Sequence, residues 1–188
     1  MSAAFDRDQV HAHIAMLHQL ATGIEGVLVL ACYGEDPQTG RRVGNTVERF
    51  AIGDVDEMVG AIMAKEGHAH LNVYAPWHVM RSDLAAGKRG GKDDVRAVLA
   101  LVVDQDADTG KSGELPMGAP YVLETSTGNF QPIYPLARAL LPGEAQPIAD
   151  ALQIATGRTM ARKIWATCGA CRERSTGPIR RRRIAADR

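Results

Sequence analysis

Long apolar runs and paired cysteines are both missing from this 188-residue chain. No stretch of 18 apolar residues occurs, so no segment matches a membrane-spanning helix. The amino-terminal stretch contains acidic residues and lacks the apolar run of a secretory signal. The three cysteines, Cys32, Cys168 and Cys171, do not make a disulfide framework. These absences predict a cytoplasmic protein that has no membrane partner.

Net charge is also absent, because 22 basic residues balance 22 acidic ones. The balance conceals an asymmetry along the chain. Residues 158–188 hold ten basic and two acidic side chains, a net charge of +8, so residues 1–157 hold twelve and twenty, a net charge of −8. An acidic body is not what nucleic-acid binding ordinarily favours, although it is compatible with a local basic groove.

Two acidic residues follow the most apolar run in the chain. Val98 to Val103 is apolar throughout, Asp104 comes directly after it, and Asp106 follows two residues later. Residues i and i+2 of a β-strand project from one face, so these carboxylates are expected to point the same way, about 7 Å apart. Two such carboxylates repel each other unless a cation lies between them, and hard oxygen ligands favour Mg²⁺ or Mn²⁺ shared with substrate phosphates.

A polar hairpin is expected beside this acidic strand. Its strands would run from Tyr121 to Thr125 and from Phe130 to Leu136, around the turn at 126–129.

Upstream of the acidic strand, residues 87–92 read GKRGGK. This turn is either a solvated loop whose glycines supply positive φ, or a phosphate-binding turn next to the aspartates. In the second interpretation Lys88, Arg89 and Lys92 act together with backbone N–H groups. The turn does not match the Walker A pattern, so a P-loop ATPase is not expected.

The remaining elements follow from periodicity and from cap and turn residues. Helices are predicted from Asp6 or Asp8 to about Thr22, from Val55 to Glu66 with Asp54 as N-cap, and from Ala145 to Thr156. Strands are predicted over Gly26 to Tyr33, Arg42 to Ile52, and His68 to Met80, where Pro76 closes the strand or places it at an edge. His11, His13 and His18 are interpreted as surface or half-buried residues of the first helix, and Cys32 as a small core residue.

Three motifs together resemble a known family. GKRGGKDDV at 87–95, the DxD of Asp104 and Asp106, and ETSTGNFQ at 124–131 stand in the order and spacing of the archaeo-eukaryotic primase superfamily. The most similar members are the RepB-like primase domains of plasmids and phages. The resemblance covers roughly residues 68–157 and implies an α/β (α+β) fold, with an RRM-like, mostly antiparallel sheet flanked by helices.

The resemblance also implies an activity, namely primer synthesis by nucleotidyl transfer on a single-stranded DNA template. Nucleoside triphosphates would be the substrates, with a replicative helicase as a further candidate partner. Asp104 and Asp106 would hold two Mg²⁺ or Mn²⁺ ions, and Ser126, Gly128 and Asn129 would form the turn facing them. Gln131 stands where many members have a phosphate-binding histidine; it donates a hydrogen bond but carries no charge.

The chain departs from the family after about Gly157. Members typically continue with an acidic residue, expected to be the third metal carboxylate, and then a VWRVPGTLNWP-like segment. Nothing similar stands in residues 158–188. One permitted codon choice for residues 157–179, read two bases out of frame, does encode such a segment. We therefore divide the chain into a primase-like domain, 1–157, and a basic tail, 158–188, interpreted as out-of-frame translation or a disordered tail.

Other functions remain open from the sequence. A non-catalytic replication protein that binds single-stranded DNA is the main alternative. The single CxxC of Cys168 and Cys171 has no second pair to complete a structural zinc site. A metal-dependent phosphohydrolase built on the same DxD would need further His or Asp ligands.

Overall fold

The computed structural model describes residues 5–36, 38–68, 71–106, 115–126, 129–156 and 170–171. Three helices in this part are α1 (Arg7–Ala21), α2 (Val55–Met63) and α3 (Pro142–Ala155), and a short 3₁₀ helix is η1 (Lys92–Asp94). The strands are β1 (Val27–Glu35), β2 (Arg42–Ala51), β3 (Asn72–Tyr74), β4 (His78–Met80), β5 (Val95–Val102), β6 (Gln105–Asp106), β7 (Tyr121–Ser126), β8 (Asn129–Leu140) and β9 (Ala170–Cys171).

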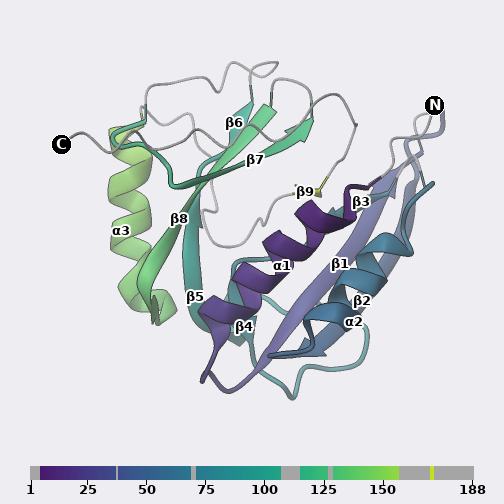
Figure 1. Ribbon diagram of the computed structural model, residues 1–188, viewed down its shortest axis with the longest axis horizontal. Helices are drawn as coiled ribbons and strands as arrows, with labels where there is room; N and C mark the ends of the chain where they lie inside the picture. Colours follow the sequence, from purple (N-terminus) through teal and green to yellow (C-terminus); the bar gives the residue numbers. More distant parts are fainter. Residues whose placement is uncertain are drawn as a thin grey trace.

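The nine described strands form one sheet, and their pairings are antiparallel. β1 pairs with β2 on one side and with both β3 and β4 on the other. β4 then pairs with β5, β5 with β8, and β8 with β7, while β6 continues the line of β5 along β8. This α+β architecture, an antiparallel sheet flanked by helices, confirms the predicted fold class (Figure 1).

Helices cover the two halves of the sheet from different sides. α1 and α2 pack over the face that carries Leu28, Leu30 and Val102, in one hydrophobic cluster. α3 packs against the other face through Ala145 and Ala149, in a second cluster. β5 contributes to both clusters and is buried along its whole length except at Arg96, which explains why its sequence is an apolar run rather than an alternation.

The bounds of several predicted elements differ from expectation; α3, for example, begins at Pro142 rather than Ala145, and β8 continues to Leu140 rather than Leu136. The strand predicted over 68–80 is interrupted, because β3 ends at Tyr74 and β4 begins at His78. Pro76 lies in the interruption, and its missing N–H cannot contribute to a continuous ladder. α2 ends at Met63 rather than Glu66, and the Asp54 side chain makes no cap hydrogen bond. At α1 the predicted cap is confirmed, since Asp6 accepts hydrogen bonds from the N–H groups of residues 8 and 9.

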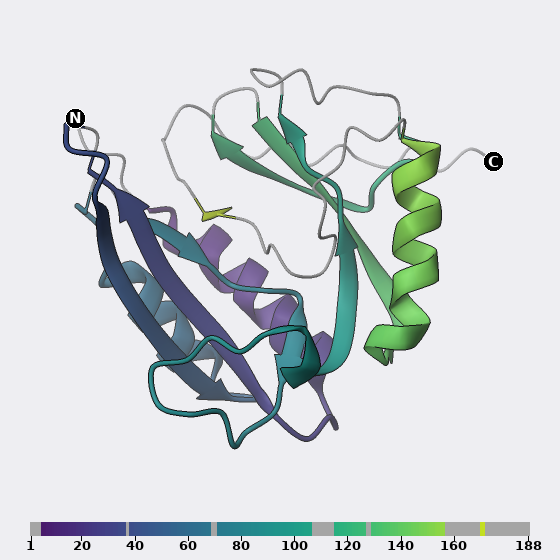
Figure 2. The same ribbon diagram turned by 180° about the vertical axis from the view of Figure 1, so that it is seen from behind.

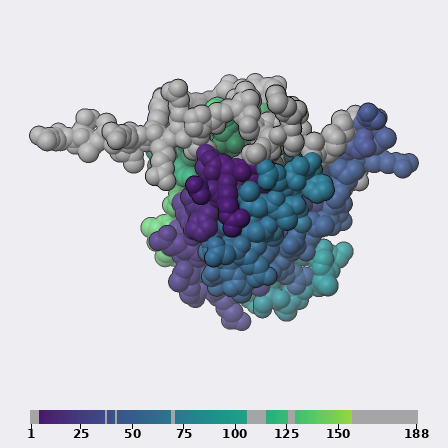
Figure 3. Space-filling model, turned by 45° about the vertical axis from the view of Figure 1, so that its right-hand side comes forward, coloured from purple at the N-terminus to yellow at the C-terminus, as the bar shows by residue number. Residues whose placement is uncertain are grey.

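Two further features concern the arrangement of the strands. The β1–β2 hairpin stands out from the body of the molecule (Figure 3). β9 comes from the segment predicted to be a separate tail and pairs with β3, in the register Val73↔Cys171 and Tyr74↔Ala170. Cys168 lies outside the described residues. Within the described part, no helix has the length and apolar character needed to cross a membrane.

Candidate functional site

The register between β5 and β8 determines where the two aspartates lie. The pairs Leu101↔Tyr134 and Val102↔Ile133 are followed, without a shift, by Gln105↔Phe130 and Asp106↔Asn129. Between them the Val103 N–H donates to the Pro132 carbonyl at 2.9 Å. The ladder therefore stays in register past the end of β5.

This register brings Asp104 level with Gln131. Alternation along the strands places both residues on the face of Val102 and Ile133, which are buried beneath α1. Asp104 is half-buried, as is Gln131. The apolar face of the sheet thus ends in a carboxylate and an amide at adjacent positions.

The next positions along the ladder are also polar. Asp106 pairs with Asn129 on β8, and Asn129 pairs with Ser126 on β7. The turn that joins β7 to β8 is braced by the Thr125 hydroxyl, which donates to the Asn129 carbonyl at 3.3 Å. Gly128 lies outside the described residues. The structure therefore brings together five of the predicted residues at one end of the sheet, where Figure 1 labels β6, β7 and β8.

The donor set at this end suits a hard divalent cation. Asp104 and Asp106 stand two residues apart at successive same-face positions of the ladder, and carboxylate ligands leave several coordination positions for water or substrate oxygens. Glu124 does not add a carboxylate to this set. It pairs with Phe130, which alternates with Asn129 and Gln131 and therefore belongs to the opposite face of the sheet. Among the described residues, no group of three or more His, Cys, Asp or Glu side chains forms a metal cluster.

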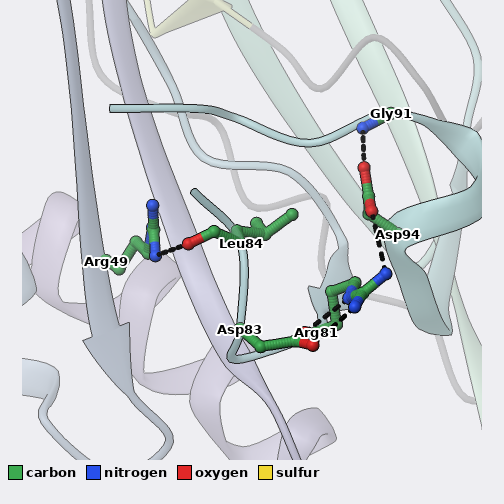
Figure 4. A network of polar contacts seen from close by, with 6 residues as sticks. All are labelled: Arg49, Arg81, Asp83, Leu84, Gly91 and Asp94. Atoms are coloured by element: carbon green, nitrogen blue, oxygen red, sulfur yellow. Dashed lines mark hydrogen bonds and ion pairs between the residues drawn. The ribbon is translucent and has the colours of Figure 1, made fainter. Parts of the chain in front are cut away.

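The basic turn, residues 87–92, is held by contacts that do not involve Asp104 or Asp106 (Figure 4). Arg81 forms an ion pair with Asp83 and lies 3.7 Å from Asp94, while its backbone N–H donates to the Asp94 carbonyl at 2.9 Å. The Asp94 carboxylate in turn accepts from the Gly91 N–H at 2.7 Å. The hydrogen bond from Arg81 lowers the pKa of Asp83 to about 2. These contacts hold the turn in a defined conformation.

A second anchor comes from β2. Arg49 donates to the Leu84 carbonyl at 2.7 Å and also to the carbonyl of Ala85. Leu84 packs against the cluster that contains Val29 and Met80. The segment before the turn is therefore fastened across the sheet face opposite α1 and α2.

The structure does not bring the whole basic turn next to the aspartates. Lys92 begins η1 directly before β5, whereas Asp104 follows the end of β5, so about 26 Å of strand separates them. Arg89 instead folds back over the sheet, where its Nη1 lies 3.4 Å from the Tyr33 hydroxyl. Lys88 is exposed in the same turn.

Sequence reasoning misassigned two histidines of α1. His13 and His18 were expected at the surface or half-buried, but they are only 6% and 3% exposed. His13 lies three residues after Val10 and four before Leu17, and His18 lies four after Ile14 and three before Ala21. This spacing was the available signal that both share the buried stripe.

His13 joins α1 to the β7–β8 hairpin. Its Nδ1 lies 3.1 Å from the Tyr121 hydroxyl, and its ring packs edge-on against Trp77 with a centroid distance of 4.9 Å. Burial lowers the pKa of His13 to about 4, because the charged imidazolium would lose its hydration.

His18 is held by the loop after β2. Its Nδ1 accepts from the Gly53 N–H at 2.9 Å, so the proton of the neutral ring resides on Nε2. That atom is buried and has no hydrogen-bond partner among the described residues. Burial lowers the pKa of His18, although Asp54 opposes the shift.

Comparison of the chain with protein-family models, with curated proteins and with solved structures found no match.

The buried histidines predict a pH-dependent stability. Between pH 6.5 and about 4 the unfolded chain binds a proton that native His13 does not, so stability is complete above pH 6.5 and falls as pH is lowered. His13 alone should reduce the free energy of unfolding by about 2 kcal/mol between pH 7 and pH 5, and His18 adds in the same direction. Urea titrations at the two pH values measure this loss. His13→Gln should remove most of the His13 share, whereas His11→Asn, at an exposed position of the same helix, should leave it in place.

Glycine requirements of the basic turn give a second prediction. Gly87 and Gly90 both have positive φ, of 68° and 84°, but only at Gly90 would a Cβ collide with the side chain of buried Met80. Gly87→Ala should cost about 1 kcal/mol of stability from backbone strain. Gly90→Ala should cost roughly 1–2 kcal/mol more, because Met80 has to move within the packed cluster. Equal losses in denaturant titrations would contradict the packing described for this turn.

Proposed function

We propose that this chain carries a primase-type nucleotidyl-transfer site at the end of β5, for replication of a plasmid, phage or other mobile element in the cytoplasm. The observation that supports this proposal is the register with β8 of the end of β5 and of β6, which runs without a shift from Ala100 to Asp106. It aligns Asp104 with Gln131 and Asp106 with Asn129 at the polar end of an otherwise apolar ladder.

Each residue has a distinct role in the proposed site. Asp104 and Asp106 supply the carboxylate oxygens that hold Mg²⁺ or Mn²⁺. When bound, these ions would neutralise triphosphate charge and activate the primer hydroxyl. Asn129 and Gln131 lie across the ladder and are suited to donate amide hydrogen bonds to phosphate oxygens. Ser126, the last residue of β7, pairs with Asn129 on this side of the site.

We also propose that catalysis is impaired in this chain. In residues 158–188 no acidic residue is followed by a VWRVPGTLNWP-like segment, the context in which the primase resemblance places the third metal ligand. Gln131 adds no positive charge where many primases have a histidine. A site with two carboxylates and an uncharged phosphate contact binds metal and triphosphate less tightly than a complete one.

The same departure supports a second candidate function. A replication protein that binds single-stranded DNA without catalysis needs a binding surface but no third carboxylate. This candidate predicts DNA binding that is independent of metal and of Asp104.

Metal-dependent incorporation of a labelled nucleotide on a single-stranded template separates the two candidates. With Mn²⁺ present, the chain should give at most trace product, and Asp104→Asn should abolish it, because one metal ligand is lost. Asp150→Asn is a matched control on α3, where residue 150 accepts a hydrogen bond from Gln146 that asparagine also accepts.

Normal turnover by the unaltered chain would contradict the proposed impairment. Product that survives Asp104→Asn would contradict the assignment of the site. DNA binding without product in any variant would favour the second candidate.

A further inference from the structure

The sheet has a face that α1 and α2 do not cover. In β1, Leu28, Leu30 and Cys32 belong to the cluster beneath these helices, so the alternate residues project from the opposite side. Figure 2 views β1, β2 and β3 from that side, and no helix lies over them there. The segment from Arg81 to Gly91 crosses part of this face and is fastened by Arg49.

Two tyrosines lie together on this uncovered face. The register Ala31↔Tyr74 and Tyr33↔Asn72 makes Tyr33 and Tyr74 diagonal neighbours on adjacent strands. Their ring centroids are 4.3 Å apart and their planes differ by 13°, so the rings are stacked. Both residues are half-buried. The two adjacent strands therefore hold a stacked pair of aromatic rings, the tyrosine pair, on this face.

A cationic side chain, that of Arg89, lies beside the tyrosine pair. Arg89 lies 3.4 Å from the Tyr33 hydroxyl through its Nη1, and exposed Lys88 precedes it in the chain. The turn that carries both cations is fixed by the contacts of Asp94 and Arg49 described above. The positive charge is thus positioned by the fold rather than carried on a solvated loop.

Stacked aromatic rings beside an arginine have the chemistry of single-stranded nucleic-acid binding. Every unpaired base presents a π-face that stacks on an aromatic ring, and the adjoining phosphate is neutralised by a cation. Arg89 is not needed to complete the core beneath the turn, because Val29, Met80 and Leu84 already form that core.

We propose that Tyr33 and Tyr74, together with Arg89 and Lys88, form a stacking platform for unpaired bases of single-stranded DNA. The choice of single-stranded DNA as ligand rests on the proposed function. The platform itself requires neither a metal nor Asp104, which follows the end of β5 on the opposite face of the sheet. It is therefore a binding surface separate from the catalytic residues.

Fluorescence anisotropy with a labelled 20-nucleotide oligo(dT), in EDTA to exclude metal, tests the platform. Tyr33→Leu and Tyr74→Leu should each weaken binding about ten-fold, because base–aromatic stacking is lost. Tyr33→Phe and Tyr74→Phe should bind within two-fold of the unaltered chain, since the ring is retained. A duplex of the same length should compete poorly, because its bases are already stacked.

The cation is tested through the salt dependence of the same binding. Arg89→Ala should reduce the slope of log affinity against log salt by about 0.7, the value for one phosphate contact on a single strand. Arg7→Ala removes the same charge from an exposed position on α1 and should leave the slope unchanged.

A second measurement guards against variants that fail to fold. Photo-crosslinking of a bromouracil-substituted oligonucleotide to the unaltered chain should give an adduct on Tyr33 or Tyr74. The platform is overturned if both leucine variants bind like the unaltered chain, if crosslinks form only elsewhere, or if the unaltered chain binds no single-stranded DNA. Lost binding in the leucine variants without even trace nucleotidyl transfer in any chain supports the platform and favours the non-catalytic candidate. Nucleotidyl transfer together with unaltered DNA binding in those variants supports the catalytic proposal and overturns the platform.

Discussion

The antiparallel pairing of β5 with β8 is the constraint on which the candidate site depends. β5 is buried on both faces, and its side chains divide between the cluster under α1 and the cluster under α3. A slip of one residue would exchange the two sets and move the buried valines against the wrong helix. Packing on both sides of β5 therefore specifies the register from Ala100 to Val102, and the polar residues beyond the strand continue it. Asp104 lies level with Gln131 because Val102 has to lie level with Ile133.

α1 and α2 cover one face of the sheet, and α3 covers the other face over different strands. This arrangement determines which positions of the strands can carry polar side chains. β5 lies between α1 and α3, so functional groups on this strand are confined to its ends. β1 is covered by helices on one side only, and its other side carries the fastened turn and the tyrosine pair. In the described part of the chain, the end of β5 and this side of β1 thus differ in character, since aspartates follow the first and tyrosines and an arginine lie on the second.

Much of the architecture could be predicted from the sequence, because most elements carry local signals. The apolar run at 98–103, the Asp6 cap and the hairpin around 126–129 all appear where the pattern indicated. The pairing of Asp106 with Asn129 was less accessible, since register between distant strands depends on packing that periodicity does not describe. The path of the basic turn could not be predicted for a similar reason. Its folding back to Tyr33 depends on Arg49 and Asp94, which are distant in sequence from one another. The burial of His13 is not evident from its residue type, although its helical spacing places it beside buried Val10 and Leu17.

The central claim is that Asp104 and Asp106 hold the divalent cation, and paramagnetic broadening by Mn²⁺ tests it most directly. In amide NMR spectra of the intact chain, substoichiometric Mn²⁺ should broaden signals from residues 104–106 and 129–131 first. Signals from the basic turn at 87–94 should persist, because the length of β5 separates Lys92 from Asp104. Uniform broadening, or broadening centred on Asp93 and Asp94, would contradict the assignment of the metal site to the end of β5.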